Sequence, residues 1–342
     1  MSDTHPSAGF HPDSTQVTEL GLPPDARPWV GPKGQVMERL ELHLTYHCPE
    51  RCLFCSEEHR MATYRPFPVT WGRVATVLRL HASRGVKAVH FTGGEPTIHP
   101  RFVEVLQLAR RLGMRTSVGT IGTMLSRPDF AARALPWLDE ALFSVHGPSA
   151  AVHDPLTGRV GSFDTVTAAM RLARQHPGFG LFANTVVTTH NLERLPETVT
   201  MLAELGARLI VVSNLTAEGG GFDRYSELAP RLSDLARVLP TLPALVPGVV
   251  LRFFGVPMCL LGPHWSSSND LHWDPRVTVE WQSAPGKVAF AGIYSWAPDR
   301  KRTRVTACDP CARRDVCMGV NDLYALTFQT DELRPFMSAR AG

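Results

Sequence analysis

Apolar and polar positions alternate along the middle of the chain in a way that predicts strands and helices in turn. Seven short runs with apolar or alternating residues are predicted strands: 40–45, 87–92, 116–120, 140–145, 180–188, 209–215 and 249–254. The stretches between them that place apolar residues three and four positions apart are predicted helices: 70–84, 100–112, 162–175, 195–205 and 226–239. Strands that alternate with helices indicate βα units around a parallel sheet.

The helix predicted at 70–84 illustrates the pattern. Thr70 is a residue type that caps helix starts, and Gly85 is a typical stop signal. Val74, Leu78 and His81 fall on one face, together with Val77. This face is expected to pack against the sheet.

About six βα units fall between residues 38 and 255, fewer than the eight of a closed barrel. The fold class expected is therefore α/β, a partial (β/α)6 TIM-like barrel with its site at the carboxyl ends of the strands. Residues 1–37 are rich in Pro, Asp, Ser and Gly and are expected to form a partly ordered arm. Residues 256–342, with short strands near 277–281 and 288–290, are expected to form a small cysteine-rich extension.

Composition excludes several classes of function. No run of 18 apolar residues occurs among the 342, so no membrane span is expected. The N-terminus (Met1 to Pro6) lacks the basic start and apolar core of a signal peptide, which favours a cytoplasmic location. The net charge is only +3, and no basic block with interleaved aromatics suggests a nucleic-acid partner.

Cysteine usage points to metal chemistry. The chain has seven cysteines, an odd number that fall in two groups, and this argues against a disulfide framework. The first group is Cys48, Cys52 and Cys55, and the second is Cys259, Cys308, Cys311 and Cys317.

The first group has the spacing C-x3-C-x2-C directly after the first predicted strand. Three thiolates leave a four-coordinate metal one ligand short. Either a distant fourth ligand completes a zinc site, with His47 and His59 as nearby candidates, or an iron–sulfur cluster keeps an open position. Buried thiols without a metal are the third reading.

A second motif stands at the end of the next strand, where Gly93-Gly94-Glu95-Pro96 would bring bare backbone close to a ligand. The two motifs together resemble the radical S-adenosylmethionine superfamily over residues 38–255. The partial (β/α)6 barrel of that family agrees with the number of βα units counted above.

The resemblance implies a set of cofactor contacts. Three irons of a 4Fe–4S cluster would be held by Cys48, Cys52 and Cys55, and the fourth would bind the amino and carboxylate groups of S-adenosylmethionine. The backbone of Gly93, Gly94 and Glu95 would line the methionyl amino group, with Phe54 near the adenine. One-electron reduction would then yield a 5′-deoxyadenosyl radical that abstracts hydrogen from substrate. An electron donor such as flavodoxin or ferredoxin is expected as a partner.

Further contacts rest on weaker matches. The family often has Thr-Asn-Gly after the third strand, and this chain departs from it with Thr120-Ile121-Gly122. Thr120 remains a candidate contact, Ser144 is a candidate ribose ligand and Asn184 is expected to face the same cavity. A plain polar residue at a strand end is the alternative for each. For Asp154 and Arg159 loop stabilisation is the simpler account, and His99, His146 and His190 are unassigned.

The second cysteine group, Cys308-x2-Cys311-x5-Cys317 with Cys259 upstream, is similar to the SPASM or twitch extensions of radical S-adenosylmethionine enzymes. It is shorter than a full SPASM pattern, which implies one auxiliary 4Fe–4S cluster. A structural zinc site is the alternative. If Cys259 does not reach the others, one iron stays open to substrate.

The function expected is a radical S-adenosylmethionine enzyme whose auxiliary cluster assists electron transfer. Its substrate is expected to be a ribosomal peptide whose side chain is modified, and the alternative is a small metabolite. An iron–sulfur electron carrier or sensor without turnover and a zinc-binding interaction module are hypotheses of other classes. The strand end at residues 93–96 argues against both, because neither needs a bound S-adenosylmethionine.

Overall fold

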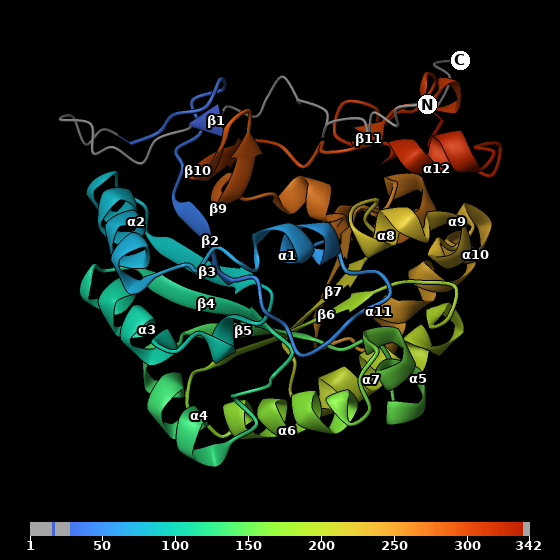
Figure 1. Ribbon diagram of the computed structural model, residues 1–342. Coiled ribbons are helices and arrows are strands. Elements are labelled where there is room, and N and C mark those ends of the chain that lie inside the picture. Colours follow the sequence, from blue (N-terminus) through green and yellow to red (C-terminus); the bar gives the residue numbers. More distant parts are fainter. Residues whose placement is uncertain (1–15, 18–27, 338–342) are drawn as a thin grey trace, which may run out of the picture.

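The computed structural model describes residues 16–17 and 28–337, and its centre is one curved sheet (Figure 1). Ten strands form it in the order β1-β10-β9-β2-β3-β4-β5-β6-β7-β8. Parallel pairs join β9 to β2 and then each strand in turn from β2 to β8. The strands are β1 (Gln16–Val17), β2 (Arg39–Thr45), β3 (Ala88–Gly93), β4 (Arg115–Thr120), β5 (Glu140–Ser144), β6 (Gly180–Val186), β7 (Leu209–Ser213), β8 (Val250–Phe254), β9 (Arg276–Ala284) and β10 (Lys287–Ser295). A separate two-stranded sheet pairs β11 (Arg302–Thr303) with β12 (Val320–Asn321).

Helices cover the outer side of this sheet, with α2, α3, α4 and α6 following one another around it in Figure 1. In the described residues none of the helices is long and apolar enough to cross a membrane. The helices are α1 (Glu58–Tyr64), α2 (Trp71–Ser83), α3 (Phe102–Arg111), α4 (Pro128–Ala134), α5 (Ala150–Thr157), α6 (Ser162–Arg174), α7 (Leu195–Glu204), α8 (Gly220–Asp223), α9 (Tyr225–Leu228), α10 (Leu232–Val238), α11 (Leu242–Leu245) and α12 (Asp322–Thr327).

The core follows the periodicities of the sequence. Leu40, Leu42 and Leu44 of β2 are fully buried, and the face of α2 with Val74, Val77, Leu78 and His81 packs inward as predicted. Burying a side chain of this size stabilises the fold by about 1.5–3 kcal/mol. The buried side chains between the sheet and its helices thus hold the strands in place, and the strands position the residues at their ends.

Several local predictions were wrong. The helix expected at 226–239 is two helices, because Pro230 cannot donate a hydrogen bond and Ala229 before it is extended (φ −73°, ψ 120°). Thr70 does precede α2, but its side chain makes no capping hydrogen bond. Short helices such as α1, α4, α5 and α12 were missed. Most of the arm expected at residues 1–37 lies outside the described residues.

The strands past residue 255 are longer than predicted and belong to the main sheet. β9 runs parallel to β2, with Arg39 opposite Arg276 and Leu42 opposite Val279. β10 returns antiparallel beside β9. The C-terminal extension therefore supplies the wall next to the first barrel strand, and the domain boundary at 255/256 stays a prediction.

The buried His81 predicts a pH dependence of stability. Burial lowers the pKa of His81 from 6.5 to about 4, while a hydrogen bond between its Nδ1 and the Val77 carbonyl opposes the shift. The folded state therefore resists protonation, so stability present above pH 6.5 is lost as the pH falls towards 4. Between pH 7 and pH 5 the loss from this residue is about 2 kcal/mol.

Urea unfolding at the two pH values measures this loss. His81→Gln, which can still donate to Val77, should flatten the pH dependence by about that amount. The control His190→Gln changes an exposed residue and should leave the pH dependence of the parent intact. Equal slopes for His81→Gln and the parent would contradict the prediction.

Candidate active site

The first cysteine group lies on the loop between β2 and α1, at the carboxyl end of the sheet. Cys48, Cys52 and Cys55 are all partly buried, and the Cys55 amide donates to the Cys52 carbonyl at 3.1 Å. The loop is fastened to α5, because the amides of Arg51 and Leu53 donate to the carbonyls of Thr157 and Leu156, each at 2.9 Å. The three thiols are thus carried on a braced loop.

The thiols are close enough to repel one another when ionised. Burial raises the pKa of Cys48 to about 12 and that of Cys55 to about 11. Burial likewise raises the pKa of Cys52, and Glu50 and the other two thiols raise it further. Burial therefore favours the neutral thiols, and three thiolates would be stable here only with a bound metal centre among them. The donor set therefore fits a thiolate-bound metal cluster.

The glycines at the end of β3 lie directly against the start of this loop. A Cβ on Gly93 would lie 2.3 Å from the Thr45 carbonyl oxygen, and one on Gly94 would lie 2.2 Å from that of His47. Gly93 also has a φ of 122°, which side chains disfavour. The Gly94 amide donates to the Thr45 carbonyl (2.7 Å) and the Glu95 amide to that of His47 (2.8 Å). A ligand amino group here would have to be received by carbonyl oxygens.

The side chain of Glu95 has a structural role. It is completely buried and accepts hydrogen bonds from the Thr120 hydroxyl (2.7 Å), the Ile121 amide (2.9 Å) and the Thr97 amide (3.2 Å). Burial raises its pKa, and these hydrogen bonds oppose the shift. Because the Thr120 hydroxyl is used here, a contact from Thr120 to a cofactor stays a prediction.

Phe54 contacts His146, a histidine left unassigned from the sequence, and His146 in turn stacks on His153. The Phe54 ring meets His146 edge to face at a centroid distance of 4.7 Å, and His146 stacks on His153 at 5.6 Å. His146 Nδ1 accepts from the Val186 amide at 3.2 Å, and His153 Nδ1 accepts from the His146 amide at 2.9 Å. Both rings are buried, and His146 orients Phe54. No local sequence signal distinguishes His146 from other histidines.

Ser144 and Asn184 lie opposite each other on β5 and β6. Asn184 lines a cavity of about 350 Å³ inside the barrel, and its Oδ1 accepts from the Ser213 hydroxyl at 2.6 Å. His90 and Arg276 line the same cavity. The first residues of β2, β5 and β9 line this cavity, whereas Ser144 and the cysteine loop do not. The expectation that Asn184 faces the cofactor, and the cofactor roles of Asn184 and Ser144, therefore stay predictions.

Other residues singled out in the sequence have local partners. Asp154 accepts from the Gly161 amide, the Ser162 hydroxyl and the Phe163 amide at 2.7–2.9 Å, so it stabilises the turn before α6. His99 bonds the Val69 carbonyl through Nε2 at 3.1 Å. These contacts favour the structural account of both residues.

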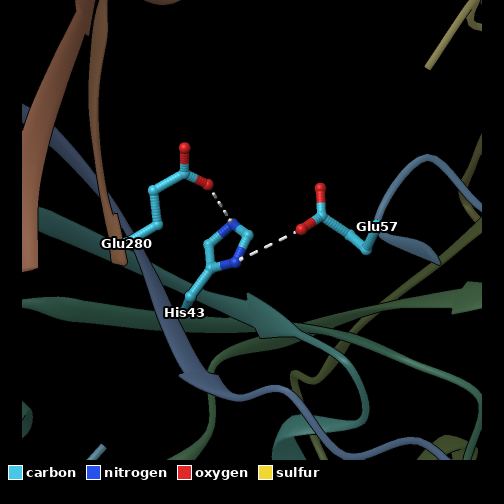
Figure 2. Close-up of side chains that lie close together, drawn as sticks. All are labelled: His43, Glu57 and Glu280. Carbon is cyan, nitrogen blue, oxygen red and sulfur yellow. Dashed lines mark ion pairs between the residues drawn. The ribbon is translucent and has the colours of Figure 1, made fainter. Parts of the chain in front are cut away.

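A buried group missed by sequence reasoning links β9 to the cysteine loop (Figure 2). His43 of β2 lies between Glu280 of β9, 3.4 Å from its Nε2, and Glu57, 3.6 Å from its Nδ1. His43 is 3% exposed and Glu280 is 2% exposed. Burial lowers the pKa of His43, although the Glu57 carboxylate opposes the shift.

One potential ligand atom from each of the three residues lies within 4.8 Å of the other two. The two carboxylates face different nitrogens of the His43 imidazole. Arg60 of α1 also forms an ion pair with Glu280. Only the pairing of β9 with β2 brings these residues together, which no local pattern could have indicated.

The four cysteines of the second group also lie close together. Cys259 lies on a 3-10 segment, Met258–Ser267, and lines a small cavity with Cys308, Cys311 and Cys317. Burial raises the pKa of Cys259 to about 12, and the thiols of Cys317, Cys308 and Cys311 raise it as well. Arg304, Arg313 and Arg314 line the same cavity. Four thiols are thus gathered apart from the first three.

Comparison with known proteins gives a consistent result. Residues 42–202 match the model of the radical SAM superfamily. The chain is 33% identical over 195 residues to the PqqA peptide cyclase of Gluconobacter oxydans, covering 56% of this chain and 53% of that protein. It is 30% identical over 205 residues to that of Rhodopseudomonas palustris, covering 59% and 53%. The chain thus spans about half the length of these curated relatives.

Solved structures share the fold. Streptococcus suis SuiB bound to S-adenosylmethionine superposes with a TM-score of 0.57 at 16% identity, over 89% of this chain and 76% of that chain. SuiB bound to its precursor peptide SuiA gives 0.54 at 16% identity, over 71% and 57%. The predicted α/β partial barrel and the predicted family resemblance are both confirmed.

Proposed function

From the radical SAM domain that residues 42–202 form, we propose that this protein is an enzyme that reductively cleaves S-adenosylmethionine and abstracts hydrogen from its substrate. The observation that carries the proposal is the contact between the cysteine loop and the glycine end of β3. There three partly buried thiols stand beside glycine backbone that carries no side chain.

Cys48, Cys52 and Cys55 would hold a 4Fe–4S cluster by one thiolate each. When bound, this cluster supplies one electron to the sulfonium of S-adenosylmethionine, which breaks a carbon–sulfur bond and yields a 5′-deoxyadenosyl radical. The methionyl amino group donates hydrogen bonds, and the carbonyls of Gly93, Gly94 and Glu95 would accept them. The amides of Gly94 and Glu95 already donate to the cysteine loop. Phe54, braced by His146, would contact the adenine, with Thr120, Ser144 and Asn184 as further cofactor contacts.

The four later cysteines would hold an auxiliary 4Fe–4S cluster of the SPASM or twitch kind. Cys259 lines the same cavity as Cys308, Cys311 and Cys317, which supports ligation by four thiolates rather than an open iron. A fully ligated centre would transfer electrons and leave substrate binding to the barrel. A one-electron carrier such as flavodoxin or ferredoxin would supply the reducing electron.

The substrate proposed is a peptide that is modified on a side chain. The relatives in sequence are called PqqA peptide cyclases, and one structural neighbour is SuiB with its precursor peptide.

Anaerobic reconstitution followed by iron and sulfide analysis tests the proposal. The protein with dithionite and S-adenosylmethionine should then release 5′-deoxyadenosine. About eight irons per chain are expected for two clusters. About four irons with one zinc would contradict the auxiliary cluster, and full iron content without 5′-deoxyadenosine would contradict the enzyme.

A further inference from the structure

The segment after β7 lies against the loop of the first cysteines. The Gly220 amide donates to the Cys55 carbonyl at 2.9 Å. A Cβ on Gly219 would lie 2.4 Å from that same oxygen, and one on Gly220 would lie 2.8 Å from the Leu53 carbonyl oxygen. Gly219 also has a positive φ of 51°. Backbone meets backbone here, which only glycines allow.

Charged residues of the same segment reinforce this contact. Arg224 donates through Nη1 to the Leu53 carbonyl at 3.1 Å and pairs with Glu58 at 3.2 Å. Asp223 lies 2.7 Å from Nε2 of His59. Residues 217–224, which we call the glycine segment, therefore fix both the cysteine loop and the start of α1.

The C-terminal extension holds the other side of the glycine segment. Lys301 donates through Nζ to the Ala217 carbonyl at 3.0 Å and lies 3.6 Å from Glu218 Oε1. Arg300 Nε lies 3.0 Å from the same carboxylate oxygen. The Glu218 side chain is 14% exposed, whereas those of Lys301 and Arg300 are 34% and 57% exposed, so the carboxylate is the shielded member of these pairs.

Lys301 reaches this position with a strained backbone. Among residues 16–17 and 28–337 it is the one non-glycine residue with positive φ, at 53°. Such a conformation is strained for a residue with a Cβ. The Asp322 amide, which donates to the Lys301 carbonyl at 3.0 Å, helps to hold it. The strain is maintained where the lysine side chain makes its contact.

The next residue, Arg302, connects to the later cysteines. Its Nη2 donates to the Gly319 carbonyl at 2.7 Å, and it pairs with the buried Asp270. The Met318 amide donates to Asp270 at 3.1 Å, and the Gly319 amide points to the Cys317 sulfur at 3.4 Å. A continuous series of contacts therefore runs from Cys317 through Lys301 and Glu218 to Cys55.

We propose that Lys301 and Glu218 are positioning residues through which the C-terminal cysteine group fixes the loop that carries Cys55. When the C-terminal cysteine group is ordered, it would fix the position of residues 300–302. These residues would in turn fix the glycine segment, and the glycine segment would position Cys55 for cofactor binding. The effect on S-adenosylmethionine affinity rests on the proposed function. The series of contacts between the two cysteine groups does not depend on the proposed function.

Lys301→Gly is the sharpest test, because glycine adopts a φ of 53° without strain while the ammonium is removed. The variant should therefore fold. In the reconstituted protein we expect faster hydrogen exchange at residues 52–58 and 217–224. We also expect S-adenosylmethionine to bind fivefold to tenfold more weakly, which a titration monitored by the change in the cluster EPR signal measures. Glu218→Gln should act in the same direction, and the double variant should be no worse than the stronger single one.

Two further variants distinguish this proposal from a general loss of stability of the fold. Lys87→Ala removes another lysine–glutamate pair, with Glu38 beside β3, and should change neither readout. Cys317→Ser should speed exchange at residues 52–58, as Lys301→Gly does.

Unchanged exchange at 52–58 in Lys301→Gly, or an equal effect of Lys87→Ala, would overturn the link. Faster exchange in a protein that does not cleave S-adenosylmethionine would support the link while contradicting the proposed function.

Discussion

Cys52→Ala is expected to abolish formation of 5′-deoxyadenosine from S-adenosylmethionine. Cys52 is the middle thiol of the loop, and its carbonyl accepts the hydrogen bond from the Cys55 amide. Removing it would leave two thiolates for three irons. The loss should exceed the ~10–100-fold that removing an outer-shell partner of a metal site usually causes. Chromatographic detection of 5′-deoxyadenosine after reduction by dithionite measures it.

A matched control is His47→Ala on the same loop. The exposed His47 was a candidate fourth ligand in the zinc reading, whereas the proposed cluster needs no histidine. Cleavage should therefore survive in His47→Ala. Equal cleavage by Cys52→Ala and the parent protein would refute the assignment of the first cysteine group.

Cys311→Ala is expected to separate cofactor cleavage from product formation. Its thiol lines the cavity of the later cysteines and touches none of the residues assigned to the first cluster. Iron content should fall by about half, to about four per chain. Cleavage of S-adenosylmethionine should survive in part. Modification of the substrate should fail, because the auxiliary cluster that would transfer electrons is lost.

Cys259→Ala provides the comparison for this second prediction. If Cys259 is the fourth ligand, its replacement should reproduce the iron loss of Cys311→Ala. Retention of all iron in both variants, or one equivalent of zinc in the parent, would contradict an auxiliary iron–sulfur cluster. Loss of cleavage as complete as in Cys52→Ala would contradict the separate roles of the two groups.

The barrel strands were predictable because their side chains repeat with a short period. Leu40, Leu42 and Leu44 alternate along β2, and the parallel order from β2 to β8 follows from the strand–helix alternation. The cysteine spacing and Gly93-Gly94 are also local patterns. Their proximity followed from the rule that consecutive parallel strands end at one edge of the sheet.

Contacts between distant segments were not predictable. His43 and Glu280 meet only because β9 pairs with β2, and Gly219 and Gly220 reach Cys55 only through the curvature of the sheet. A glycine run read alone indicates a turn, since its close approach to a carbonyl depends on tertiary packing. The break at Pro230, by contrast, was visible in the sequence and was overlooked.

The position of β9 has a consequence for dissecting this protein. Without the extension, β2 would have a free edge with unpaired amide and carbonyl groups, next to the loop of the first cysteines. Open, apolar edges of this kind recruit strands from other molecules. We therefore expect that the part of the chain up to residue 255, which carries the first cysteines, does not fold into an aggregation-resistant unit without the C-terminal extension.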